Sequence, residues 1–354
     1  MTVNKPHIFA DQGNNYHHQC YSAAQENKRA FVMLTLYPEI EPFHSQLLPR
    51  ESLPDGRQHE IYIEQCGNPD GIPVLFLHGG PGSGCRPQHR CYFDPARYHI
   101  ILFDQRGCGR SLPAGELTHN DMEHLIGDIE AIRELLKIEK WQLFGGSWGA
   151  TLALCYARQY PQRVSSMILR GTFLGRQQDI DWVYGSGGAS IVFADAWQDF
   201  IKDVPAAQQQ KPLAYYFQQL QDPDPTVQQQ AANTLQQWEA TIVMMRDTPV
   251  YDPPADTSPG PLAHSRIQLH FALNQCFIAE NPILADLSML KNIPTIIVHG
   301  RYDMVCPFQQ SWLLKQQLPS AELRIVPLAG HAAGEPALID ALVRASDEMA
   351  NRFA

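Results

Sequence analysis

The sequence Phe144-Gly145-Gly146-Ser147-Trp148-Gly149-Ala150 follows a short apolar run and leads into an apolar helical stretch. Its Gly-x-Ser-x-Gly pattern is typical of a nucleophile elbow, a sharp turn from a strand into a helix that lifts a serine hydroxyl clear of a sheet. The backbone of such a turn is strained, and a Cβ on a neighbouring residue would collide with the adjoining strand and helix. The pattern makes Ser147 a candidate nucleophile, although a lone match fits an ordinary turn equally well.

A serine nucleophile needs a base to take its proton and an acid to orient that base, and in α/β hydrolases the order is serine, acid, histidine. The apolar run 294–300 predicts a buried strand, and Asp303 follows it. The run 322–327 predicts another strand, and His331 lies in the loop after it. Either residue alone would be interpreted as an ordinary cap or turn residue. Parallel strands place ligands at their carboxyl ends, so together the three residues predict a catalytic triad.

A glycine-rich segment, His78-Gly79-Gly80-Pro81-Gly82, follows a further predicted strand. Glycines let the main chain approach a ligand closely, and Pro81 has no N–H that would compete as a donor. We expect the amides of Trp148 and Gly80 to form an oxyanion hole, with Gly79 as the alternative to Gly80. A phosphate-binding loop is the rival interpretation, but no Lys-Ser/Thr pair follows this segment.

A third glycine-rich segment, Asp104-Gln105-Arg106-Gly107-Cys108-Gly109-Arg110-Ser111, follows the next apolar run. With HGGPG, DQRGCGRS and GGSWG after three successive strands, the chain resembles the proline iminopeptidases, α/β-hydrolase serine peptidases that remove an N-terminal proline. The resemblance runs from about Leu36 to the carboxyl terminus and includes the HGRYD and GHAAGEP segments. It implies catalysis by Ser147, Asp303 and His331, with no cofactor and no metal.

The alternation of predicted strands and helices indicates an α/β-hydrolase fold, a mostly parallel sheet flanked by helices. We expect residues 33–173 and 290–354 to form this core, with 59–65 as an antiparallel edge strand. Residues 174–289 show helical runs, glutamine-rich stretches and a proline-rich link instead of strands. This segment predicts an inserted helical cap over Ser147, where substrates would be selected.

Composition excludes several classes of function. A chain of 354 residues that is 44% hydrophobic can bury a full core and still carry an insertion. The net charge of −10, with no basic cluster, argues against a nucleic-acid partner. The eight cysteines include no Cys-x-x-Cys pair, so we expect free thiols in the cytoplasm rather than a zinc site or a disulfide framework. No stretch approaches the roughly 20 apolar residues that span a membrane.

The amino-terminal segment lacks the pattern of a signal peptide. Residues 12–19 are polar where an apolar segment would be needed. We expect residues 1–32 to be a poorly ordered extension, although a leader that packs on the domain is the other interpretation. Because the family resemblance begins close to Met33, this methionine is an alternative start.

An exopeptidase must bind a free ammonium group, and carboxylates near the serine are the direct means of doing so. The resemblance implies two glutamates in the cap, and Trp238-Glu239 matches the first. At the second, Arg266-Ile267-Gln268 carries glutamine instead. Gln268 can accept a hydrogen bond but carries no negative charge, so amine binding should weaken by about 1 kcal/mol or more. The preferred N-terminal residue is therefore left open.

These expectations describe a serine exopeptidase that releases an N-terminal residue, preferably proline, through an acyl-enzyme. Its substrates would be short peptides or aminoacyl amides and esters. An esterase or amidase of the same fold without strict aminopeptidase specificity is the alternative, which Gln268 makes credible. A ligand-binding module without catalysis is a third interpretation, because a fold does not determine a function.

Overall fold

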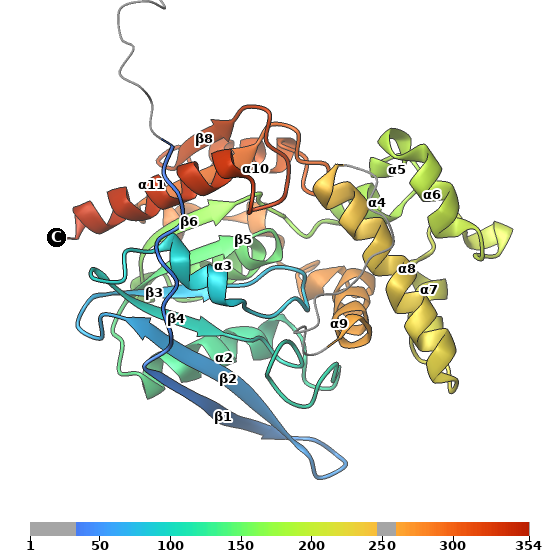
Figure 1. Ribbon diagram of the computed structural model, residues 1–354, viewed down its shortest axis with the longest axis horizontal. Coiled ribbons are helices and arrows are strands. Elements are labelled where there is room, and N and C mark those ends of the chain that lie inside the picture. Colours follow the sequence, from blue (N-terminus) through green and yellow to red (C-terminus); the bar gives the residue numbers. More distant parts are fainter. Residues whose placement is uncertain (1–32, 246–259, 354) are drawn as a thin grey trace, which may run out of the picture. The chain divides into compact units, whose positions relative to one another are not determined.

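An eight-stranded sheet forms the centre of the computed structural model, which describes residues 33–245 and 260–353 (Figure 1). Along the chain the strands are β1 (His44–Ser52), β2 (Gln58–Gly67), β3 (Ile72–Leu77), β4 (Tyr98–Phe103), β5 (Trp141–Gly146), β6 (Val164–Arg170), β7 (Thr295–Gly300) and β8 (Glu322–Val326). Their order in the sheet is β1-β2-β4-β3-β5-β6-β7-β8. β1 and β2 are antiparallel to their neighbours and the other strands are parallel, which is the predicted α/β architecture.

The prediction of an edge strand at 59–65 is wrong in its position. β2 contains this run, but it pairs with β1 on one side and with β4 on the other, so β1 is the edge. The sequence of β1 gives little apolar signal, because its side chains are exposed or half-buried and Pro49 interrupts it. An edge strand tolerates such a proline because one side of its backbone has no partner strand.

The central strands are buried on both faces, which explains their continuous apolar sequences. In β4 all six residues are buried. Its side chains alternate, so Ile101 and Phe103 join one hydrophobic cluster whereas Ile100 and Leu102 join the other.

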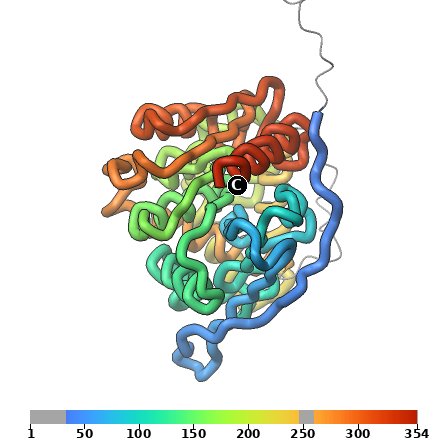
Figure 2. Tube along the Cα trace, turned by 90° about the vertical axis from the view of Figure 1, so that its left-hand side faces the viewer, coloured from blue at the N-terminus to red at the C-terminus, as the bar shows by residue number. Residues whose placement is uncertain are grey.

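Helices cover these two faces. α2 (Met122–Leu135), α3 (Trp148–Gln159) and α10 (Gln309–Gln317) contribute to the first cluster, and α11 (Pro336–Arg352) packs on the second (Figure 1). The segment that leads into β1 runs beside α11 (Figure 2). There the Leu34 N–H donates to Asp340 at 2.6 Å and the Tyr37 hydroxyl donates to Asp347 at 2.8 Å. The predicted extension, residues 1–32, lies outside the described residues.

A helical insertion lies between β6 and β7 (Figure 1). Its longer helices are α4 (Gln177–Tyr184), α6 (Ala194–Ile201), α7 (Leu213–Gln219), α8 (Pro225–Met244) and α9 (Pro261–Leu273), with the short α5 (Ala189–Val192) between α4 and α6. Trp238 of α8 is buried against Trp197 and Phe200, and its indole N–H donates to the Val183 carbonyl at 2.9 Å. Within the two described ranges no helix is both long and apolar enough to cross a membrane.

Candidate active site

Ser147 lies at the turn between β5 and α3 with φ 56° and ψ −123°, a conformation that side chains rarely adopt. The flanking glycines make this turn possible. A Cβ on Gly145 would lie 2.3 Å from the Gly149 carbonyl oxygen, and a Cβ on Gly149 would lie 2.0 Å from the carbonyl oxygen of Leu77. Larger residues would therefore force β5, α3 and β3 apart, as the Gly-x-Ser-x-Gly pattern predicts.

Asp303 and His331 meet at the carboxyl ends of β7 and β8. His331 Nδ1 donates to Asp303 Oδ2 at 2.7 Å, which leaves Nε2 as the nitrogen without the aspartate contact. The other carboxylate oxygen of Asp303 accepts the N–H groups of Val305 at 3.0 Å and Cys306 at 2.7 Å. The acid is thus held on both oxygens, and it fixes the tautomer of the imidazole.

The environment of Asp303 favours its ionised form. Burial alone would raise the pKa of this carboxyl group, but the attraction and hydrogen bond of His331 outweigh burial and hold the pKa below its usual value. The group therefore remains a carboxylate at neutral pH and can stabilise an imidazolium.

Two side chains that the sequence patterns did not single out lie against the candidate triad residues. Arg170, the last residue of β6, places Nη1 3.3 Å from His331 Nε2 and donates to the His331 carbonyl at 3.0 Å. The Arg170 guanidinium packs against Gly146, because a Cβ on this glycine would lie only 2.6 Å from Arg170 Nη2. The Ser147 hydroxyl lies 3.8 Å from Cys306 Sγ. Among the described residues, Ser147 has no hydrogen bond to His331, and hydrogen bonds between catalytic groups are often long in free enzymes.

The predicted oxyanion segments lie beside the serine. A Cβ on Gly79 would be 3.7 Å from the Ser147 Cβ, so the glycine loop runs against the elbow. Trp148 begins α3, and its N–H therefore has no acceptor within the helix. In the described part of the chain, neither this N–H nor that of Gly80 has a hydrogen-bond partner. Both groups are available to an incoming anion.

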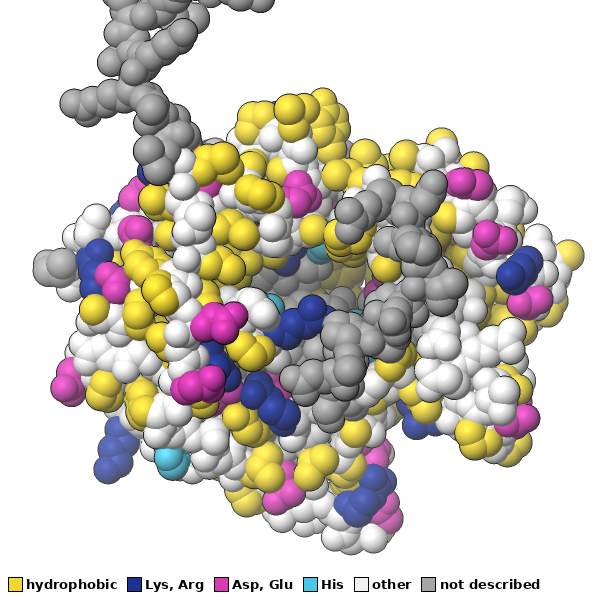
Figure 3. Space-filling view, viewed as in Figure 1, with side chains coloured by type: hydrophobic (Ala, Val, Ile, Leu, Met, Phe, Trp, Pro, Cys, Tyr) yellow, Lys and Arg dark blue, Asp and Glu magenta, His cyan; other side chains and the backbone are white. Residues whose placement is uncertain are grey.

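A pocket of about 890 Å³ opens between the core and the insertion. It contains Ser147 and His331 from the core and Glu239 and Gln268 from the insertion. The walls are mostly apolar and include Phe173, Ile180, Val183, Phe271 and Val305. Figure 3 shows the hollow on this face, with histidine and Lys/Arg side chains inside it.

The insertion directs Glu239 and Gln268 into this pocket from α8 and α9. The Glu239 carboxylate accepts hydrogen bonds from the Tyr184 hydroxyl and from the Gln268 side chain. Burial raises the pKa of Glu239 to about 6, although these two hydrogen bonds oppose the shift. Gln268 is 7% exposed, and its Oε1 atom has no partner among the described residues. Oε1 is therefore a buried acceptor without a partner, on a residue that lines the pocket.

No group of three or more His, Cys, Asp or Glu side chains within the described ranges is arranged to hold a metal ion. The groups in the pocket instead provide a hydroxyl, a base with its acid, free N–H donors and a carboxylate. This set of groups suits the transfer of an acyl group from a positively charged substrate to the serine hydroxyl.

Comparisons with known proteins identify the family of the chain. The alpha/beta hydrolase fold family model matches residues 72–337. The chain is 43% identical over 316 residues to a proline iminopeptidase of Xylella fastidiosa, with 89% of this chain and 99% of that protein covered. It is 42% identical to a proline iminopeptidase of Arabidopsis thaliana over 317 residues, which cover 89% of this chain and 82% of that protein.

Solved structures support the fold. A proline iminopeptidase-related protein of Thermus thermophilus superposes with a TM-score of 0.53 at 21% identity, covering 87% of this chain and 97% of that one. An epoxide hydrolase from a hot-environment metagenome gives a TM-score of 0.55 at 20% identity, with 87% and 98% covered. The family model and the relatives above 40% identity together show that this chain belongs to the proline iminopeptidase family of α/β hydrolases.

Proposed function

We propose that this protein is a serine aminopeptidase that releases N-terminal proline from short peptides through an acyl-enzyme on Ser147. The observation that carries the proposal is that one pocket contains Ser147, His331 and the carboxylate of Glu239. A hydrolase that selects a free amino terminus needs this combination, because the carboxylate fixes the ammonium while the serine attacks the adjacent carbonyl. The identity to proline iminopeptidases supports the same reaction.

In the acylation step, His331 Nε2 takes the Ser147 hydroxyl proton while Oγ attacks the carbonyl carbon of the N-terminal residue. The carbonyl oxygen becomes an anion, which the N–H groups of Trp148 and Gly80 would bind, with Gly79 as the alternative to Gly80. Asp303 stabilises the imidazolium. His331 then gives its proton to the leaving amine, the peptide bond breaks, and the shortened peptide departs.

Deacylation repeats these steps with water as the nucleophile. His331 accepts a proton from water, whose oxygen attacks the ester carbon of the acyl-enzyme. The imidazolium then returns the proton to Ser147 Oγ as the ester bond breaks. The free amino acid leaves with its carboxylate.

Recognition of the amino end is assigned to Glu239 and Gln268. The ammonium of an N-terminal proline is secondary and has two N–H donors. One would bind the Glu239 carboxylate and the other the free Oε1 atom of Gln268. A charged and a neutral acceptor then share the ammonium, and the apolar walls of the pocket receive the pyrrolidine ring.

A second candidate function, an esterase or amidase without strict aminopeptidase specificity, is favoured by one observation. Glutamine at position 268 leaves Glu239 as the carboxylate that faces the pocket among its described lining residues. If Glu239 contributed nothing to amine binding, substrates with and without a free amino end would react alike.

A cytoplasmic location is part of the proposal, because all seven cysteines in the described ranges are free thiols.

The change Gln268→Glu is expected to raise kcat/KM for free-amine prolyl arylamides about five- to tenfold, and to leave N-blocked prolyl esters nearly unchanged. A second carboxylate would pair with the ammonium in a site shielded from water. Repulsion from Glu239 opposes this gain, since one of the two carboxyl groups tends to keep a proton. The measurement is steady-state kinetics at pH 7.5 on both substrates, with Glu239→Gln expected to reduce the free-amine reaction selectively. Equal changes on both substrates would show that neither residue binds the amine.

The ratio of free-amine to N-blocked hydrolysis should fall as the pH drops through about 6. Only the ionised form of Glu239 attracts the ammonium, and its pKa of about 6 means that the group takes up a proton below this pH. The titration of the proposed triad affects the hydrolysis of both substrates equally, so its effect cancels in the ratio of the two rates. It should become independent of pH in Glu239→Gln. A wild-type ratio that is constant from pH 5 to 8 would contradict the assignment.

Product analysis tests the proposed function. The protein is incubated with an unblocked tripeptide that begins with proline, and the products are separated by chromatography. Free proline and the intact dipeptide are expected. Labelling by a fluorophosphonate, with the adduct located by peptide mass mapping, should modify Ser147. A protein that forms no adduct and no product would be a binding module.

A further inference from the structure

Gln105 joins the two segments that carry the proposed oxyanion donors. It follows β4 and is 1% exposed. Its side-chain Nε2 donates to the His78 carbonyl at 3.0 Å, and its Oε1 accepts the indole N–H of Trp148 at 2.8 Å. His78 directly precedes Gly79 and Gly80, and Trp148 carries the other donor on its own backbone. One carboxamide therefore spans the two sides of the oxyanion hole.

The His78 ring adds a second connection between the same segments. The backbone N–H of Gln105 donates to His78 Nε2 at 3.0 Å, so the proton of the neutral ring lies on Nδ1. Nδ1 then donates to the Gly79 carbonyl at 2.9 Å. Burial lowers the pKa of His78, which keeps the ring neutral and maintains this arrangement. The His78 ring thus connects the backbone of the glycine loop to Gln105, and both of its nitrogens form hydrogen bonds.

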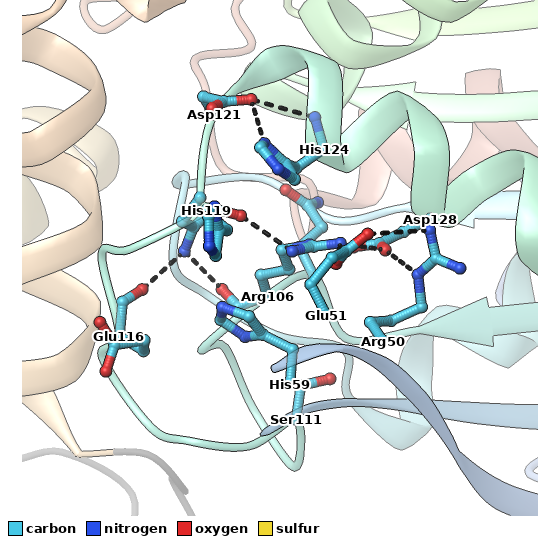
Figure 4. Close-up of polar contacts among 12 residues, drawn as sticks. Arg50, Glu51, His59, Arg106, Ser111, Glu116, His119, Asp121, His124 and Asp128 are labelled. Atoms are coloured by element: carbon cyan, nitrogen blue, oxygen red, sulfur yellow. Dashed lines mark hydrogen bonds and ion pairs between the residues drawn. The ribbon is translucent and has the colours of Figure 1, made fainter. Parts of the chain in front are cut away.

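The residues on either side of Gln105 are anchored by separate ion pairs. Asp104 accepts the Cys85 N–H at 2.6 Å and pairs with Arg110 at 2.7 Å, which holds the far end of the glycine loop. Arg106 is fully buried and pairs with Asp128 of α2 at 2.6 Å. Figure 4 shows Arg106 among these contacts, which also include Glu51 of β1.

We propose that Gln105 is a positioning residue for the proposed reaction, one that fixes the distance between the two oxyanion donors. The inference rests on the proposed function, in which the N–H groups of Trp148 and Gly80 bind the anion. Removing a single oxyanion donor costs about 100- to 1000-fold in kcat, and displacing a donor by a few tenths of an ångström costs part of that. The ion pairs of Asp104 and Arg106 give the bridge a rigid base.

The test compares Gln105→Leu with the wild type in the full-length protein. Leucine removes both carboxamide hydrogen bonds with little change in volume. We expect kcat for a prolyl arylamide to fall about 10- to 100-fold, with KM changed less than about threefold. Trp148→Phe removes the indole donor together with part of a buried ring that packs on Phe271, and kcat should fall less than in Gln105→Leu. Gln142→Leu is the matched control, because Gln142 is an equally buried glutamine of β5 that bonds Tyr98 and Ser166 away from the pocket.

Inhibitor binding separates positioning from a merely structural role. Ser147 Oγ adds to the carbonyl carbon of the aldehyde analogue of proline while its proton passes to His331 Nε2, and the former carbonyl oxygen of the adduct occupies the oxyanion site. In Gln105→Leu the inhibition constant of this aldehyde should rise by the same factor by which kcat/KM falls. The inhibition constant of free proline should change less than about threefold, since proline makes no such adduct. Gln142→Leu should leave both inhibition constants unchanged.

The proposal is overturned if folded Gln105→Leu keeps its wild-type affinity for the aldehyde. It is also overturned if the affinities for aldehyde and proline fall together, since that would show general damage to the pocket. Should Gln105→Leu not fold, Trp148→Phe decides by the same two constants. Turnover by Ser147→Ala would instead refute the proposed function, so the two failures are distinguishable.

Discussion

Ser147→Ala is expected to lower kcat for prolyl arylamides by about five to six orders of magnitude while the protein stays folded. Without the hydroxyl no acyl-enzyme can form on Ser147, so the covalent route that divides the reaction into two easier steps is lost. The turn itself does not need the hydroxyl, because the glycines at 145 and 149 determine the close approach of β5 and α3. Alanine at position 147 therefore leaves the fold unchanged.

The measurement is steady-state hydrolysis together with a thermal melt of the same preparation. Ser320→Ala provides the matched control, since Ser320 is exposed and lies in a turn before β8. It should retain wild-type kcat. Activity within tenfold of wild type in a folded Ser147→Ala protein would exclude this serine as the nucleophile.

Asp303→Asn is expected to lower kcat about 10⁴-fold. One oxygen of Asp303 accepts two backbone N–H groups, from Val305 and Cys306, so an asparagine would keep its carbonyl oxygen there. Its NH₂ group would then face His331 Nδ1 and donate to it. The imidazole proton would be placed on Nε2, which could no longer accept the proton of the serine.

The control is Asp55→Asn, because Asp55 is an exposed residue in the turn between β1 and β2. Steady-state kinetics at pH 7.5 should give a wild-type kcat for this control. A loss of less than tenfold in folded Asp303→Asn would show that this aspartate does not orient His331.

The elbow and the order of the candidate triad could be predicted because their signals are local. The glycines on either side of Ser147 are required by the crowding within a single turn. Asp303 and His331 each follow an apolar run that corresponds to a strand. The structure brings Asp303 and His331 into hydrogen-bond contact, as the order of the chain predicted. Their catalytic roles are the subject of the predictions above.

Other features depend on contacts between distant segments and leave no local signal. Arg170 contacts His331 only because β6 lies next to β5 and because Gly146 leaves room for a guanidinium. Its place at the carboxyl end of a strand was the single available indication. β1 was missed because an edge strand with few buried residues lacks the apolar pattern on which the prediction relies.

The glutamines show the same limit. Gln268 was selected from the family resemblance, but its hydrogen bond to Glu239 and its free Oε1 required the packing of α9 beside α8. In the sequence, Gln105 is one residue of a glycine-rich segment and carries no signal of its own. Its bridge between His78 and Trp148 depends on three loops that meet at one edge of the sheet.

The amine dependence of hydrolysis tests the central claim most directly. The measurement is the wild-type kcat/KM for a prolyl arylamide and for its N-acetylated counterpart, which differ only in the ammonium group. Because the Glu239 carboxylate would pair with that ammonium in a shielded site, the free-amine substrate should react at least about 100-fold faster. Equal rates, or faster hydrolysis of the acetylated substrate, would contradict the assignment of an aminopeptidase and favour the esterase or amidase.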